Sequence, residues 1–168
     1  MTPRSSIRAL WGSVSARPPE PGDEAFLYTL YSATRADEFS IVEMNPRQLE
    51  ALVRMQYEAQ KLGYQTQFPD AEHTILLYNG EAIGRLLVNE SPSEILLVDI
   101  ALLKTFRGQG LGTDIVRGLM ERAAQSGKPL RHSILRTNEP ALRTARRLGH
   151  TVTQAGEVFI ELEWQASK

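Results

Sequence analysis

The stretch FRGQGLGTDI, residues 106–115, carries a glycine at each of positions 108, 110 and 112. It follows residues 94–103 (EILLVDIALL), a nearly continuous apolar run typical of a central strand that is covered on both faces. From residue 111 to residue 126 the apolar side chains recur at helical spacing. The stretch is therefore predicted to join a buried strand to a helix through backbone that turns freely and can be approached closely.

This loop has the features of an anion-binding site. The first turn of the following helix offers unpaired N–H groups and a partial positive charge, and glycines let a phosphate reach them without meeting a Cβ. Arg107 adds a permanent positive charge. We interpret the loop as a phosphate or pyrophosphate cradle, with a tight packing turn as the alternative.

Two nucleotide-binding motifs fit the loop poorly. A P-loop has a lysine before its serine or threonine, whereas Gly112 comes directly before Thr113. A dinucleotide-binding loop spaces its glycines as G-x-G-x-x-G, with an acidic residue at the end of the next strand. Here the spacing is G-x-G-x-G, and the next predicted strand ends in Arg136.

The remaining chain gives a mixed order of elements, β-α-α-β-β-β-α-β-α-β-β, with an Asn-Gly hairpin turn at residues 79–80. The predicted strands are residues 13–17, 73–78, 81–89, 94–103, 130–136, 151–154 and 157–164, and the predicted helices are 23–32, 45–62, 111–126 and 140–148. This order predicts an α/β (α+β) fold, with a mostly antiparallel sheet of about six or seven strands flanked by about four helices. We expect one domain over residues 13–168, preceded by a flexible N-terminal arm at residues 1–12.

Composition argues against several functions. The 168 residues include no cysteine and three scattered histidines, so neither a disulfide framework nor a metal site is expected. No apolar run reaches the roughly 18–20 residues of a membrane span, and the first residues lack the apolar segment of a signal peptide. We therefore expect a cytoplasmic protein that does not enter a membrane.

The charges are segregated along the chain. Residues 104–147 hold ten Lys/Arg and three Asp/Glu, whereas the remainder holds nine and seventeen. The segregation reflects either ordinary solvated surface or two functional parts of the chain. In the second case the basic segment binds an anion and the acidic remainder tolerates a cation. Nucleic acid is a poor candidate for the anion, because aromatic residues are not interleaved with the basic ones.

Two motifs together resemble the GNAT superfamily of N-acyltransferases. Residues 107–112, Arg-x-x-Gly-x-Gly after an apolar strand, are similar to the family's acyl-CoA pyrophosphate motif. Residues 138–149 resemble a later segment, in which an asparagine begins a helix and Leu-Gly with an aromatic residue ends it. The predicted element order also matches, so the resemblance covers about residues 13–164 and implies a GNAT-type fold.

The resemblance implies a role for each matching residue. Backbone N–H groups of the loop would hold the pyrophosphate, and the end of the preceding strand would separate from its neighbour and pair with the pantetheine arm. The N–H of Leu102 would point at the thioester carbonyl and stabilise the oxyanion, which makes Leu102 catalytic through its backbone. The residues implied to bind acetyl-CoA are Ile100, Ala101, Leu102, Arg107, Gly108, Gln109, Gly110, Leu111, Gly112, Thr113, Asn138 and Ala141. Lys104, Arg143 and Arg146 could meet the CoA phosphates.

Several positions depart from the family pattern. Lys104 stands where many members have proline, and His150 where they have an aromatic residue. Ala145 stands where many carry a tyrosine that protonates the leaving thiolate, and Ser133 where some carry a glutamate base. A base must then come from elsewhere, and Asp99 is a catalytic candidate because it interrupts an apolar strand. The alternative for Asp99 is a hydrogen bond or an ion pair at the strand edge.

Two further features concern the acceptor side. Tyr28, Tyr31, Tyr64 and Tyr78 are candidate proton donors, each with a structural role as its alternative. On the second predicted helix, residues 49, 53, 56 and 60 share one face that turns polar toward its end. That face is either a wall of the substrate pocket or a solvated helix end.

These observations predict an N-acetyltransferase that moves an acetyl group from acetyl-CoA to a primary amine by direct transfer in a ternary complex, without a metal. The alternative is a GNAT-fold protein that binds acyl-CoA as a sensor or interaction module with little turnover, and Ala145 is its best support. The acceptor is left open among a protein N-terminus, lysine, polyamine, aminoglycoside and small amino compound. Dimers are common in the family, so the resemblance also allows a homodimer.

Overall fold

The computed structural model describes residues 12–39 and 43–167, so the predicted arm at residues 1–12 lies outside it except for Gly12. Within these residues seven strands form one sheet: β1 (Val14–Arg17), β2 (Glu72–Tyr78), β3 (Glu81–Glu90), β4 (Ile95–Leu102), β5 (Leu130–Leu135), β6 (Thr151–Ala155) and β7 (Phe159–Trp164). The helices are α1 (Glu24–Phe39), α2 (Pro46–Gln67), α3 (Leu111–Ser126) and α4 (Glu139–Arg147), with short 3-10 helices η1 (Pro21–Asp23) and η2 (Lys104–Phe106). The predicted fold class is confirmed.

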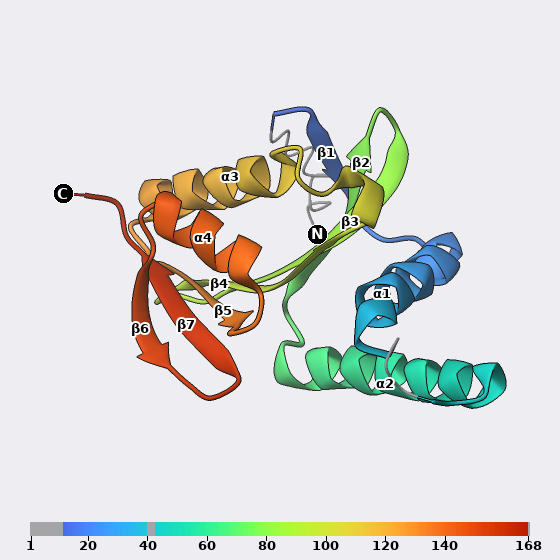
Figure 1. The fold of residues 1–168 in the computed structure, drawn as a ribbon. Coiled ribbons are helices and arrows are strands. Elements are labelled where there is room, and N and C mark those ends of the chain that lie inside the picture. Colours follow the sequence, from blue (N-terminus) through green and yellow to red (C-terminus); the bar gives the residue numbers. More distant parts are fainter. Residues whose placement is uncertain (1–11, 40–42, 168) are drawn as a thin grey trace.

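The strands lie in the order β1-β2-β3-β4-β5-β7-β6, and every neighbouring pair is antiparallel except β4 with β5. That parallel pair is connected by α3, which crosses over the sheet as parallel strands require. Figure 1 shows α3 and α4 on one face of the sheet and α1 and α2 on the other. Ile115, Leu119 and Ala123, spaced by four residues along α3, are fully buried against the sheet.

Two helices extend beyond their predicted ends. α1 continues past residue 32 to Phe39, because residues 33–39 contain no glycine or proline and Phe39 packs against the cluster between α1 and α2. α2 passes through Gly63 to Gln67, because one glycine costs a helix interior only about 1 kcal/mol relative to alanine. By contrast, α3 has the predicted bounds.

The Asn-Gly hairpin turn between β2 and β3 is confirmed. Asn79 and Gly80 both have positive φ, 50° and 80°. Two successive residues with positive φ make a type I′ turn, whose twist matches that of the strands it joins.

Strand β3 lies close against β4 at Gly84. In their register Gly84 opposes Leu102, and Arg85 opposes Ala101. A Cβ built on residue 84 would lie 2.2 Å from the carbonyl oxygen of Ala101 and 2.8 Å from Cδ2 of Leu102. Glycine therefore allows this close approach and sets the position of the C-terminal half of β4.

Replacing Gly84 with alanine should destabilise the protein by about 1–3 kcal/mol, because the added methyl group fits only if β3 and β4 move apart. Urea denaturation followed by circular dichroism measures the free energy of unfolding. The matched control is Gly63→Ala, since a Cβ at position 63 meets nothing within 4 Å and the residue lies inside α2. That control should gain about 0.5–1 kcal/mol. Equal effects of the two substitutions would contradict the close contact of β3 with β4.

Candidate active site

Strands β4 and β5 pair over only three residues and then separate. Residues 95–97 pair with residues 130–132, and beyond them no described residue of β5 pairs with β4. The register of β4 with β3 shifts at the same point and leaves Val98 as an extra, bulged residue. A bulge bends its strand and increases the local twist. The separation of this strand from its neighbour, expected from the family resemblance, is therefore present and begins at Val98.

Beyond the bulge, alternate residues of β4 turn their main-chain groups toward the opening between β4 and β5. The N–H of Leu103 donates to the carbonyl oxygen of Ile83 in β3 (2.8 Å). Because main-chain groups alternate in an antiparallel pair, Leu102 and Ile100 face away from β3. The carbonyl oxygen of Leu102 agrees with this direction, since it accepts a hydrogen bond from Nε of Arg107 (2.9 Å). The N–H groups of Ile100 and Leu102 are therefore presented to the opening.

The side chains of the same residues divide between the two faces of the sheet. Ile100 and Leu102 pack against the core under α3. The neighbouring side chains of Asp99 and Ala101 therefore point to the opposite face, toward α1 and α2. One short segment of β4 thus offers backbone donors at its edge and a carboxylate on one face.

The glycine loop leads from the end of β4 into the first turn of α3. Gly108 and Gly110 have φ of 73° and 82°, left-handed backbone that favours glycine. Gly110 is also the N-cap of α3 and provides no side-chain cap. The N–H of Asp114 donates to the carbonyl oxygen of Gly110 (3.0 Å), so the N–H groups of residues 111–113 have no partner within the helix. The loop has the unpaired donors expected of an anion cradle.

A cavity of about 740 Å³ connects this opening with α1 and α2. The predicted site residues that line it are Asp99, Ile100, Ala101, Leu102, Arg107, Gly108 and Asn138. The other predicted residues do not line it: Gln109, Gly110, Leu111, Gly112 and Thr113 continue the loop into α3, and Ala141 packs against the core cluster under α4. The structure therefore brings the strand end and the start of the loop to one cavity, with Asn138 at its edge.

The side chains of α1 form a wall of the cavity of which the sequence analysis named only Tyr31. The lining residues outside the prediction include Leu27, Leu30, Thr34 and Arg35 from α1, Arg85 from β3 and Leu135 from β5. Gln60 of α2 also lines the cavity, so the polar end of the helix face identified in the sequence is a pocket wall. Of the four candidate tyrosines, Tyr31 lines the cavity. Arg85 could have been found, because it is a charge within an apolar strand.

Arg85 and Asp99 form an ion pair on the cavity wall. Nε and Nη2 of Arg85 lie 3.1 and 2.6 Å from Oδ2 of Asp99. Nη2 also donates to Oε1 of Gln60 (3.1 Å), and the guanidinium lies 5.5 Å from the ring centroid of Tyr64. Burial raises the pKa of Tyr64 to about 12, so its hydroxyl remains protonated at neutral pH. The ion pair that the sequence offered as the alternative to a catalytic role for Asp99 is therefore present. The Asp99 carboxylate also lines the cavity.

Positions that depart from the family pattern lie in the core around α4 or on the surface. Ala145 is buried in the cluster under α4, and Ser133 is exposed on β5. His150 is buried, and its Nδ1 lies 3.1 Å from the carbonyl oxygen of Ala145, to which it donates because a carbonyl can only accept. Its ring meets the buried ring of His132 edge to face, with centroids 4.9 Å apart. None of the three lines the cavity.

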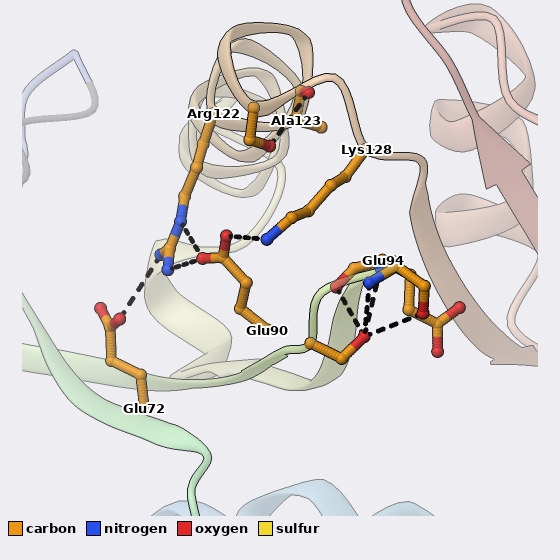
Figure 2. A network of polar contacts seen from close by, with 9 residues as sticks. Glu72, Glu90, Glu94, Arg122, Ala123 and Lys128 are labelled. Atoms are coloured by element: carbon orange, nitrogen blue, oxygen red, sulfur yellow. Dashed lines mark hydrogen bonds and ion pairs between the residues drawn. The ribbon is translucent and has the colours of Figure 1, made fainter.

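Ion pairs explain part of the charge segregation. Figure 2 shows Glu90 between Arg122 and Lys128, with Glu72 on the far side of Arg122. Nε of Arg122 and Nζ of Lys128 lie 3.0 and 2.7 Å from the Glu90 carboxylate. These two basic residues therefore tie the end of α3 to acidic residues of β2 and β3. Lys104, Arg143 and Arg146, which could meet the CoA phosphates, are exposed.

Residues 12–39 and 43–167 contain no group of three or more His, Cys, Asp or Glu placed to hold a metal ion. Among the helices within those ranges, none combines the length and the apolar character that crossing a membrane requires.

Comparison with protein families matches residues 39–150, more than half of the chain, to the model of the acetyltransferase (GNAT) family. A solved structure of similar fold is the PaiA N-acetyltransferase of Thermoplasma acidophilum in complex with coenzyme A, with a TM-score of 0.68, 14% identity and coverage of 92% of this chain and 99% of that chain. An acetyltransferase from Thermus thermophilus has a TM-score of 0.66, 17% identity and coverage of 92% and 97%. The ribosomal-protein-S18-alanine N-acetyltransferase of Escherichia coli has a TM-score of 0.63, 16% identity and coverage of 92% and 95%. Comparison with curated proteins gave no match.

Acidic pH should destabilise the protein through the buried pair His132 and His150. Burial, and to a lesser extent His150, lowers the pKa of His132 to about 4, against about 6.5 in the unfolded chain. Burial also lowers the pKa of His150. The unfolded chain then binds protons that the folded protein excludes, so stability is complete above about pH 6.5 and is lost as the pH falls toward about 4. The loss through His132 should be on the order of 3 kcal/mol.

Urea denaturation at several pH values between about 7 and 4.5 measures this slope. Above about pH 5.5 the carboxyls of Glu24 and Glu90, whose pKa values the neighbouring hydrogen bonds lower, are ionised in both the folded and the unfolded chain, so the slope there comes from the histidines. His132→Phe keeps an aromatic ring but cannot titrate, so it should remove the share of the slope that His132 contributes. Burial also lowers the pKa of His150 and of His73, so their shares remain. A slope in this variant equal to that of the wild type would show that His132 does not contribute to the acid sensitivity.

Proposed function

The chain belongs to the acetyltransferase (GNAT) family, whose members use acetyl-CoA to acetylate amines, and we propose that it transfers an acetyl group to a primary amine directly, within a ternary complex. One observation carries the proposal: the open edge of β4 and the start of the loop that leads into the uncapped α3 meet at one cavity. In Figure 1 the loop between β4 and α3 passes the edge where the sheet divides.

The glycine loop would hold the pyrophosphate of acetyl-CoA. The N–H groups of residues 111–113 have no partner within α3, and Gly110 carries no side chain that would compete with a phosphate. A Cβ at Gly108 or Gly110 would meet nothing within 4 Å, so space beside the loop is open. Arg107 is exposed at the start of the loop and adds positive charge there. These residues fit an anion of the size and charge of a pyrophosphate.

The edge of β4 would bind the pantetheine arm as an added strand. Ile100 and Leu102 present N–H groups to the opening, and an extended amide-containing chain can pair with such an edge. When bound, acetyl-CoA supplies an acetyl group activated as a thioester. The N–H of Leu102 would then donate to the thioester oxygen, and its fixed position in the strand would stabilise the negative charge that develops there.

Asp99 would accept a proton from the attacking amine. A lysine-like amine, with a pKa of about 10.4, is almost wholly protonated at pH 7, and freeing its lone pair costs about 4–5 kcal/mol. Asp99 lines the cavity on the face toward α1 and α2, and Arg85 contacts only its Oδ2. Oδ1 is therefore available to the amine. As the new C–N bond forms and the C–S bond breaks, the amine proton would leave through Asp99.

The second candidate function is an acyl-CoA-binding protein with little turnover, and Ala145 is the observation that favours it. Its methyl group is buried in the core and cannot donate a proton to a leaving thiolate. A thiol pKa of about 8.5 allows the thiolate to leave before solvent protonates it, so the missing donor does not forbid transfer. A screen of amines with acetyl-CoA, followed by release of free thiol, separates the two functions.

Arg107→Glu should weaken the binding of acetyl-CoA at least about tenfold, because it places a negative charge beside the pyrophosphate, and tenfold corresponds to about 1.4 kcal/mol. Isothermal titration calorimetry measures the Kd, with NADH and ATP as comparison ligands. Arg47→Glu makes the same charge change at the start of α2, outside the cavity, and should leave the Kd unchanged. If both variants bound acetyl-CoA as tightly as the wild type, the pyrophosphate would lie elsewhere.

Asp99→Asn should lower kcat by about a hundredfold, the usual contribution of a positioned general base, while the Kd of acetyl-CoA stays the same. Steady-state kinetics with the best amine from the screen measures the effect. Asp70→Asn, at an exposed position outside the cavity, is the control. A purely structural role for Asp99 would instead lower the melting temperature and leave kcat per folded molecule unaltered.

A further inference from the structure

Arg85 keeps part of its guanidinium group free. An arginine has five N–H donors, and three of them are used here: Nε and one Nη2 hydrogen on Asp99, and the other Nη2 hydrogen on Gln60. No described residue accepts from Nη1. Nη1 is also not among the buried polar atoms without a partner, so it is accessible, and the cavity that Arg85 lines is where a ligand can reach it.

The surroundings fix the direction of those free donors. The Arg85 side chain is only 12% exposed. Asp99 and Gln60 hold Nε and Nη2 of the guanidinium, and Tyr64 lies against it at 5.5 Å. Nη1, held in place in this way, loses little freedom when a ligand binds, and its charge-assisted hydrogen bond favours an anionic acceptor atom such as a carboxylate oxygen.

The charges around the cavity favour an acceptor with an anionic group. Among the lining residues Arg35, Arg85 and Arg107 are positive, and Asp99 is the carboxylate. Arg107 belongs to the loop at the CoA end, whereas Arg35 and Arg85 lie on the side of α1 and β3. Arg85 is paired with Asp99, but its Nη1 is left without an acceptor among the described residues. A polyamine or an aminoglycoside, with several positive charges and no anionic group, would not supply that acceptor.

We propose that the acceptor is a small amine that also carries a carboxylate, and that Nη1 of Arg85 binds this carboxylate. This assignment rests on the acetyl transfer proposed above and names the class of its acceptor. Oδ1 of Asp99, which Arg85 does not contact, receives the amine, so the ion pair offers neighbouring groups of opposite charge to a zwitterion. A cavity of about 740 Å³ is of the size that holds a small molecule.

The first test compares acceptors in pairs, one with the carboxylate and one without it; the comparison between enzyme variants cancels the difference in amine basicity within each pair. Free amino acids and their carboxamides are assayed with acetyl-CoA, and kcat/KM is determined for the wild type, Arg85→Gln and Arg47→Gln. The wild type and Arg47→Gln should favour the acid over its carboxamide at least about tenfold, which corresponds to about 1.4 kcal/mol. Arg85→Gln should lose this preference. A wild type that favours the carboxamides or does not discriminate, or an Arg85→Gln variant that keeps the preference, overturns the proposal.

A second test does not depend on turnover or on a folded variant. The side-chain Nε–H resonance of Arg85 is followed by NMR in the CoA-bound wild-type protein during titration with N-acetyl amino acids and with their carboxamides. The acids should shift this resonance and the carboxamides should not. If no acid shifts the Arg85 resonance, the proposed carboxylate site is overturned. The proposed acetyl transfer is not overturned by that result, provided that acetyl-CoA binds. Failure of acetyl-CoA to bind at all would overturn both.

Discussion

From Val98 onward β4 has a hydrogen-bonded neighbour on one side only, and the site depends on that constraint. A strand edge with unpaired N–H and C=O groups is normally covered, because an unsatisfied buried group costs about 1–3 kcal/mol. Here Arg107 satisfies the Leu102 carbonyl with its side chain, and the N–H donors remain for an extended ligand. Gly84 contributes to the same geometry from the other side, since only its missing Cβ lets β3 approach the main chain of this segment.

The ion pair of Arg85 and Asp99 places charge in the apolar middle of β3 and of β4. The two side chains are 12% and 25% exposed. Removing a pair of charges from water costs about as much as their attraction returns, so such a pair is poor evidence for stability. Its contacts point to a role in the cavity instead. Gln60 links the pair to α2 and Tyr64 lies against it, so the helices that close the cavity also orient its charged groups.

The sequence was informative where a local rule decides the structure, and less so where packing decides it. The bounds of α3, the Asn-Gly turn and the glycine loop were predictable because helical periodicity and positive φ are local. The wall formed by α1 was not, because its apolar face packs on the sheet and on α2 with no pattern that marks a ligand. Ala141 matched a motif, but its N–H is bonded to the Asn138 side chain (3.3 Å) and its methyl group meets the core. Arg85 could have been predicted as a site residue, because it is a charged residue among apolar ones, as Asp99 is in the next strand.

His150, at the position where the family resemblance implies an aromatic residue, places a titratable ring in the core. A neutral imidazole can fill the position of an aromatic ring, and its Nδ1–H donates to Ala145 at the end of α4. Nε2 of His150 and of His132 are both buried without a partner, an arrangement that is stable while each is an unprotonated nitrogen and costly once it carries a charge. Protonation of the pair therefore places a charge in the core beside the C-terminal end of α4, where no described residue compensates it.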